Sequence, residues 1–344
     1  MNLYWPVYLK LEKEVLSLAD AIHFSDDQIS VYSIQIADLI VRCAVEIEAL
    51  SKELYKSLGG NMSPVDAEGN KRDLYFDTDC MVLINIRWHL DKKSVTITAP
   101  TMYFEKNKRL IPLAKSSKRG GPKWNKAYQA LKHNRYENLK LATVGNLLLA
   151  LGALYLLNVY YKDEKFRIGK LKADHLEFKN ELGSSIFLVE FYQAHLFEWG
   201  ENGGKMRALA GDDLDASAYI IKYEDSDYEG MYHYWCLDQR WEKKNFEAND
   251  RIKNYLSRHP EDKDKTIKEI CLLADNGKDN LYKQIKFDVF VTSSYGDTVL
   301  EAVLNEAQDI YPVVQKPTDE ELDAEINNLW MQALIQSHRA KKLW

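Results

Sequence analysis

The chain has 344 residues, of which 46% are hydrophobic and 28% are charged, and its formal net charge is −6. This composition is too apolar for a disordered protein, and the length allows two or three domains. The four cysteines are scattered, with no CxxC pair. A disulfide framework is therefore excluded, and we expect free thiols in a reducing compartment.

The N-terminus lacks a basic region followed by an apolar core, so we expect no signal peptide. The longest apolar run, Leu147–Leu157, is eleven residues long and is bounded by Asn146 and Asn158. A membrane-spanning helix needs roughly 18–20 apolar residues. We therefore predict a helix buried in protein, no membrane contact, and a cytoplasmic location.

Positive charge is concentrated in one segment. Residues 105–140 contain eleven Lys or Arg and two Glu, a local balance of +9, so the remaining residues carry −15. Such a segment in an acidic protein suggests an anionic partner at that place. The alternative is a solvated loop whose lysines pair with the acidic remainder.

In chain order, Tyr4–Ala21 is predicted as a short helix or a paired strand. A long helix is predicted from about 28 to 58, because apolar residues recur at steps of three and four from Ile36 to Leu54. Asp26 or Asp27 is the expected N-cap. Both segments would form part of an N-terminal helical domain, residues 1–161.

Residues 61–122 interrupt the helical pattern. We predict an insertion there with a short β-hairpin or small sheet, its strands at 80–88 and 94–100. A helix restarts near Lys123. Asn134 with Glu137 three residues later resembles a capping box, so the chain is expected to kink there before a buried helix that runs from about Arg135 to Tyr161.

Residues 162–344 are predicted to form a mixed α+β domain. The expected elements are strands at 184–192, 217–224, 230–237 and 287–293, helices near 245–258, 264–275 and 297–309, and a final helix that opens at Thr318 with Glu321 and runs toward Arg339.

Two acidic motifs fail on inspection. Asp225–Gly230 begins like a calcium loop, but the twelfth position is Cys236, where a bidentate Glu belongs. Asp262–Thr266 has the spacing of an aspartyl-phosphate nucleophile, but it precedes a predicted helix instead of ending a buried strand, which favours helix capping. With no nucleotide, flavin or zinc motif, we expect no cofactor and no metal.

The strongest candidate site is Lys-His-Asn-Arg, residues 132–135. A histidine such as His133 can move protons in RNA phosphodiester chemistry, and the Arg135 guanidinium can stabilise charge on the phosphoryl group without a metal. Glu46 is the expected acid that orients Arg135. The alternative is a polar helix joint in which Arg135 pairs with an acid, Glu46 above all, on the first long helix.

Neighbouring basic and aromatic side chains could hold RNA, the lysines along the backbone and the rings on splayed bases. The expected RNA-binding residues are Lys123, Trp124, Lys126, Tyr128, Lys132 and Tyr136. The alternative is that Trp124, Tyr128 and Leu131 belong to the core.

Four features follow one another in a characteristic order: a long amphipathic helix carrying VEIEALSKELY (45–55), an inserted region, a short helix with a polar Arg/His motif, and the Ala/Leu-rich segment 141–157. Together they resemble the HEPN superfamily of helical bundles, common in bacterial defence and toxin–antitoxin systems. The resemblance covers about residues 28–161. It implies metal-independent RNA cleavage, a homodimer with facing motifs, and an antitoxin or defence partner.

The family signature places a histidine four to six residues beyond the arginine, and here that stretch, 139–141, contains none. Arg135 alone carries over, with Glu46 or Glu48 as the orienting acid, and His133 would have to substitute. Two hypotheses follow: a defence or toxin-type protein that cleaves or binds RNA, and a non-catalytic module that holds a partner protein. The predicted fold class is α+β.

Overall fold

The fold in the computed structural model is α+β, with helices predominating over strands, as the sequence predicts. The structure describes residues 3–117, 120–162, 166–170, 184–193, 196–198, 205–207, 213–286, 299–307 and 310–329. The chain divides into two compact units, each formed from separate stretches. The first is Met1–Ile168, Glu177–Lys222 and Glu301–Ile310, and the second is Gly169–Leu176, Tyr223–Leu300 and Tyr311–Trp344.

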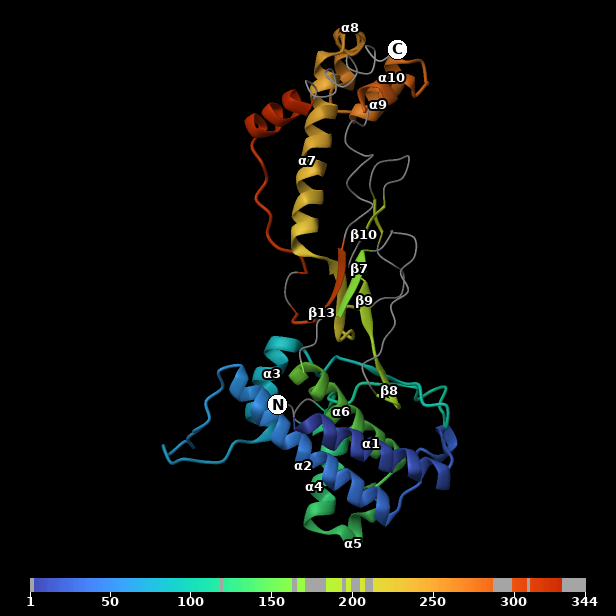
Figure 1. The fold of residues 1–344 in the computed structure, drawn as a ribbon, viewed down its shortest axis with the longest axis vertical. Helices are drawn as coiled ribbons and strands as arrows, with labels where there is room; N and C mark the ends of the chain where they lie inside the picture. The colour runs from blue at the N-terminus through green and yellow to red at the C-terminus, as the bar shows by residue number, and fades with distance from the viewer. Residues whose placement is uncertain are drawn as a thin grey trace, which may run out of the picture. The chain divides into compact units, whose positions relative to one another are not determined.

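The first unit is built on a helical bundle (Figure 1). Its members are α1 (Tyr4–Ala21), α2 (Ile34–Ser57), α4 (Lys123–His133) and α6 (Val144–Lys162). α6 contacts the other three, which explains why it is apolar on all sides. Its residues Leu151, Leu154 and Leu157 are completely buried, so the predicted buried helix is confirmed.

The buried helix differs from the prediction at its start and agrees with it at its end, Lys162. It begins at Val144 instead of Arg135, because the Val144 and Gly145 N–H groups donate to the carbonyls of Val31 and Ile29. The segment Val144–Tyr161 is long and apolar enough to cross a membrane by length and composition, and 83% of it is buried inside the protein. Burial in the bundle accounts for its apolar character.

The start of α2 corrects another expectation. The helix begins at Ile34, and Ser33 is its N-cap, with its hydroxyl accepting the Ile36 N–H at 3.1 Å. Asp26 instead accepts the backbone N–H groups of Glu105 and Lys106, at 2.8 and 3.0 Å. These bonds lower the pKa of Asp26 to about 2. The aspartate fixes a loop of the insertion and does not cap the helix.

The insertion contains both strands and a helix. β2 (Val95–Ile97) confirms the predicted strand at 94–100, and it pairs with later strands on both sides. The predicted strand at 80–88 is wrong, because that segment forms a π-helical turn, η2 (Phe76–Cys80), and α3 (Met81–Trp88). Cys80, Ile84 and Trp88 are buried at intervals of four residues, which is helical spacing.

Some of the small sheets join segments far apart in the chain, and others pair neighbouring segments. β2 lies between β4 (Arg109–Leu110) and β8 (Phe187–Val189). β1 (Phe24–Ser25) pairs with β3 (Met102–Tyr103). β5 (Lys115–Ser117) pairs with β6 (Gly120–Pro122), and β10 (Leu196–Glu198) pairs with β11 (Lys205–Arg207). The pairing of β2 with β8 confirms strand structure within 184–192. It also brings residues from both sides of Tyr161 into the first unit.

A four-stranded sheet has the order β7-β13-β12-β9. Its strands are β7 (Phe166–Lys170), β9 (Phe191–Gln193), β12 (Tyr219–Tyr223) and β13 (Val299–Leu304). β12 confirms the strand predicted at 217–224. The helix predicted at 297–309 is wrong: Leu300, Ala302 and Leu304 are buried in strict alternation, the period of a strand. The strand predicted at 287–293 lies outside the described residues.

The second unit is helical over most of its described length. Its helices are α7 (Asp225–Ala248), α8 (Asp250–Arg258), α9 (Ile267–Ala274) and α10 (Asn280–Ile285), followed by a helical segment at 319–329. The predicted helices near 245–258 and 264–275 are confirmed. So is the opening of the last helix, where Thr318 and Glu321 exchange hydrogen bonds. Its predicted continuation toward Arg339 lies outside the described residues.

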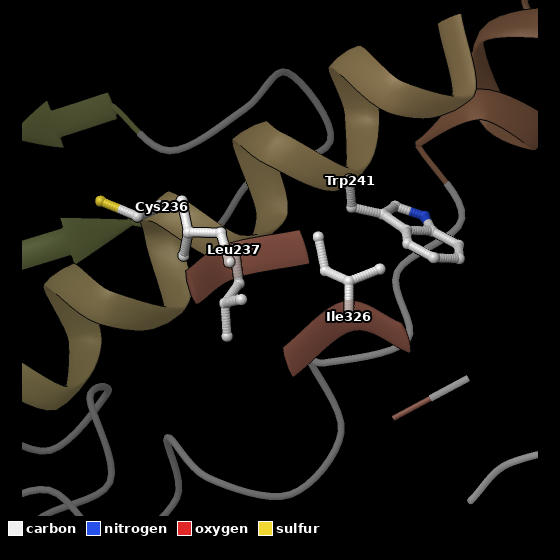
Figure 2. Packing of buried hydrophobic residues seen from close by; sticks show 5 residues of the cluster. Cys236, Leu237, Trp241 and Ile326 are labelled. Carbon is white, nitrogen blue, oxygen red and sulfur yellow. The ribbon is translucent and has the colours of Figure 1, made fainter. Parts of the chain in front are cut away.

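The strand predicted at 230–237 lies inside α7 and is wrong. Leu237 and Trp241, four residues apart, face the last helix and pack with its Ile326, while Cys236 lies beside them (Figure 2). All four cysteines are free, as expected, and all four are buried. Burial raises the pKa of Cys43 to about 12 and that of Cys271 to about 11, so these thiols stay protonated and unreactive.

Candidate nucleic-acid interface

Helix α4 has one buried face and one exposed face. Trp124, Tyr128 and Leu131 are 0%, 3% and 2% exposed, and they face α2 and α6. Outside this buried face lie Lys123, Lys126, Lys132 and His133, all exposed. The spacing of three and four residues on the buried side is that of an amphipathic helix. Packing therefore directs the basic residues to solvent.

Trp124 is a core residue. Its indole Nε1 donates to the Pro112 carbonyl at 2.9 Å, and its ring centroid lies 5.7 Å from that of Phe76. Tyr128 is buried beside it, with the Lys132 ammonium 5.6 Å from the centre of the Tyr128 ring. The expectation that Trp124 and Tyr128 stack on RNA bases is therefore wrong, because both rings are used to pack the bundle.

A polar joint separates α4 from the short helix α5 (Arg135–Asn138). Asn134 leaves the helical region at φ −151° and ψ 84°, and its side chain accepts the Glu137 N–H at 3.4 Å. The Asn138 amide donates to the carbonyls of Asn134 at 2.8 Å and Ala130 at 3.3 Å. The kink predicted from Asn134 and Glu137 is confirmed. Two asparagines satisfy the backbone groups that the break in the helix frees.

Arg135 has a different partner from the one predicted. Its guanidinium donates to the Asp38 carboxylate at 2.6 Å, and the two side chains are 45% and 54% exposed. Glu46 lies eight residues beyond Asp38 on α2, about 12 Å along the helix. Burial raises the pKa of Tyr4, and the negative charges of Glu53 and Glu46 add to this effect. Glu46 therefore lies close to the start of α1, away from Arg135.

The predicted catalytic group is not assembled within one chain. His133 is exposed, and among the described residues no hydrogen bond or ion pair joins it to Arg135 or Glu46. Asp38 is the acid that orients Arg135, and sequence reasoning missed it. The sequence did contain a signal for Asp38. If α2 and α4 are antiparallel in the bundle, the end of α4 meets the beginning of α2, where Asp38 lies, and not its middle, where Glu46 lies.

The exposed surface of α4, α5 and the turn η3 (Leu139–Leu141) is strongly basic; we call it the α4–α5 surface. It carries Lys123, Lys126, Lys132, His133, Arg135 and Lys140, with Glu137 as its exposed acid. In the described part of the chain none of these lysines forms an ion pair, whereas Arg135 does. Tyr136 is 95% exposed beside them. Such a surface can bind a polyanion that carries stackable rings.

No protein-family model matches the chain, and no characterised protein or solved structure matches it either. The relation to the HEPN superfamily therefore stays a prediction.

Proposed function

We propose that the protein binds RNA through the α4–α5 surface, as part of a bacterial defence or toxin–antitoxin system. The observation that carries the proposal is the set of exposed lysines without acidic partners, Lys123, Lys126, Lys132 and Lys140, on a protein whose net charge is −6. Acidic residues are abundant in this chain, yet in the described part none of them forms an ion pair with these four. A cationic surface left free in an acidic protein supports an anionic partner.

The dimensions of the surface suit a nucleic-acid backbone. Lys126 and His133 are seven residues apart on α4, about two turns, so they lie on the same side of the helix and about 10 Å apart along its axis. This length matches roughly three consecutive phosphates of one strand, which follow one another at about 3.4 Å along the axis in duplex form. Flexible lysines on a convex helix suit recognition of charge rather than sequence.

Tyr136 favours RNA with unpaired bases. Tyr136 is 95% exposed in the first turn of α5, directly after Arg135 in the sequence. An exposed aromatic ring that does not serve the core can stack on a splayed base, a contact worth about 1–3 kcal/mol. Of the three aromatic residues predicted to bind RNA, Tyr136 is the one that the fold leaves available.

Metal-independent RNA cleavage is the second candidate, favoured by the exposure of His133 and Arg135 on the same surface. An imidazole and a guanidinium can together move a proton and stabilise a phosphorane-like transition state. Within one chain these groups are not joined. Cleavage would therefore require a homodimer in which a second copy faces the first, as the family resemblance implies.

The binding test is fluorescence anisotropy with a labelled single-stranded RNA of mixed sequence and the full-length protein. The K123A/K126A/K132A variant should bind more weakly, and its salt dependence should flatten by about two units in the slope of log K against log salt, roughly 0.7 per lost phosphate contact. A K10A/K13A/K56A variant is the matched control, because it removes three exposed charges from α1 and α2. Equal affinity for all three proteins would exclude the α4–α5 surface.

The cleavage test uses the same RNA with excess EDTA and follows fragment formation on a gel. Activity in the wild type that is lost in both H133A and R135A would support an endoribonuclease. RNA binding without cleavage identifies a non-catalytic RNA-binding module. If neither is observed, and a protein partner binds this surface with little dependence on salt, the protein-binding alternative is correct.

A further inference from the structure

Three metal-ligating side chains converge in the second unit, at a place that the sequence patterns did not mark as a metal site. They belong to His259, Glu261 and Asp262, which follow α8 directly. One ligand atom from each residue lies within 4.8 Å of the other two. His259 and Glu261 are exposed at the surface, and Asp262 is buried beneath them.

The local backbone brings these side chains together. α8 ends at Arg258, and Pro260–Asp262 form a short 3₁₀ turn, η4, with Pro260 in its first position. The His259 N–H donates to the Tyr255 carbonyl, and the Asp262 N–H donates to the His259 carbonyl at 3.2 Å. The reversal of the chain after a helix places the side chains at positions one, three and four of the turn on one side.

Tyr255 holds two of the three groups in place. Its ring stacks on the His259 imidazole, with centroids 4.7 Å apart and planes at 28°. Its hydroxyl donates to Asp262 Oδ2 at 2.6 Å. Metal sites commonly have such outer partners, which orient the ligands before the ion arrives. Tyr255, a residue of α8, therefore positions both the His259 imidazole and the Asp262 carboxylate.

The distances fit a small transition-metal ion. His259 Nδ1 and Glu261 Oε1 are 3.2 Å apart. Two ligands of a tetrahedral zinc ion, each at about 2.0–2.1 Å, are separated by about 3.3 Å. The Asp262 ligand atom lies within 4.8 Å of the other two, so it has to move by up to about 1.5 Å to reach this separation. An imidazole with two carboxylates favours zinc and its neighbours over Mg²⁺ or Ca²⁺, which prefer oxygen ligands alone.

We propose that His259, Glu261 and Asp262 bind a divalent transition-metal ion, with Zn²⁺ as its representative. The remaining coordination positions are open to water, because two of the ligands lie at the surface. Two internal contacts compete with the ion: His259 Nδ1 contacts Glu261 Oε1 at 3.2 Å, and the Lys265 ammonium lies 2.7 Å from Asp262 Oδ1. Binding of the metal ion displaces this lysine from the carboxylate. The proposed site is independent of the RNA-binding surface.

The test is calorimetric titration of the full-length, tag-free protein with Zn²⁺ and, separately, with Mg²⁺. We expect one Zn²⁺ per chain and much weaker binding of Mg²⁺. H259A should weaken Zn²⁺ binding by roughly tenfold or more. The matched control is H233A, which removes a histidine that also contacts a carboxylate, Glu325 Oε2 at 2.7 Å, and which should leave the affinity unchanged.

Two further variants test the geometry itself. K265A should tighten Zn²⁺ binding, because the competing cation is gone. Y255F keeps the stacked ring but removes the hydroxyl, and should weaken binding by about tenfold. Circular dichroism without metal verifies that each variant is folded. The absence of stoichiometric Zn²⁺ binding, equal affinity in H259A, or no gain of affinity in K265A would each overturn the proposal.

Discussion

Two helix joints that each contain a histidine differ in what their side chains do. The α4–α5 joint, residues 132–135, and the α8–η4 joint, residues 258–262, each place a histidine at the end of a helix among charged residues. At the α4–α5 joint the cations extend separately into solvent, and Arg135 pairs with Asp38 on another helix. At the α8–η4 joint an imidazole and two carboxylates meet within 4.8 Å.

The difference comes from the side chains at each joint and from what lies beneath them. Residues 132–135 include no acid, and their side chains are exposed, while the adjoining Leu131 is buried in the bundle. Under the α8–η4 joint the ring and hydroxyl of Tyr255 hold the histidine and the aspartate together. Composition alone suggested catalysis at the first joint and simple helix capping at the second. Packing decides which polar groups can cooperate.

The largest expected effect tests whether Trp124 belongs to the core or to the RNA-binding surface. Trp124→Ala should lower the free energy of unfolding by about 3–5 kcal/mol, because a fully buried aromatic side chain leaves a cavity. Urea denaturation measures the change, with Trp124→Phe as a milder control. A stability loss below about 1 kcal/mol together with weaker RNA binding would show that the ring serves RNA instead of the core.

The exposed lysines of the α4–α5 surface can be compared with Lys93, which is 1% exposed in the same unit. Burial lowers the pKa of Lys93 to about 8, although the charges of Asp215, Asp213 and Asp91 oppose this shift and that of Lys92 adds to it. Its Nζ donates to the Asp215 carbonyl at 2.9 Å. The folded protein therefore holds fewer protons than the unfolded chain between about pH 8 and 10.5.

It follows that the buried Lys93 charge destabilises the fold at neutral pH, and that this penalty disappears as the pH rises through that window. Relative to Lys93→Met, the wild type should gain on the order of 2–3 kcal/mol of unfolding free energy from pH 7.5 to pH 10. Paired urea titrations of the two proteins at each pH measure this gain. Parallel pH profiles would contradict it.

The helix after the α8–η4 joint offers a smaller effect, which separates capping from metal binding. Thr266 and Glu269 form a capping box at the start of α9, with hydrogen bonds of 3.4 and 2.9 Å. Thr266→Ala should lower stability by about 0.5–2 kcal/mol, and Asp264→Ala should change it by less than about 0.5 kcal/mol. Thermal melts in EDTA measure both. A larger loss of stability in Asp264→Ala than in Thr266→Ala would mean that the aspartate, and not Thr266, caps α9.

The smallest effect is expected at Arg135. Because its ion pair with Asp38 is about half exposed, Arg135→Ala should change stability by about 0.2–1 kcal/mol, and moderate salt should reduce the difference. A loss of 3 kcal/mol or more in urea denaturation would mean that the pair is buried and structural. The melting temperature of this variant therefore says little about catalysis, and RNA binding and cleavage have to be measured directly.

Sequence reasoning was successful where a short segment carries its own signal. The period of α2, the apolar run in α6 and the Asn134 kink each depend on neighbouring residues, and each is present. It was wrong where a pattern had two solutions. Cys80–Trp88 and Gly230–Leu237 are rich in strand-forming residues, but both fold as helices. In the first, Cys80, Ile84 and Trp88 are buried at steps of four, and in the second, Leu237 packs with Trp241 four residues later.

Amino-acid order by itself therefore determined the bundle helices α2, α4 and α6, the basic character of residues 105–140, and the presence of strands near 94–100 and 217–224, but left Tyr4–Ala21 open between helix and strand. The tertiary structure alone decided which strands pair, that Asp38 and not Glu46 meets Arg135, that Trp124 is buried, and that His259 meets Glu261 and Asp262. These outcomes depend on contacts between residues brought together by packing or by a chain reversal. Local periodicity contains no information about such distances, and they are fixed only when the core is complete.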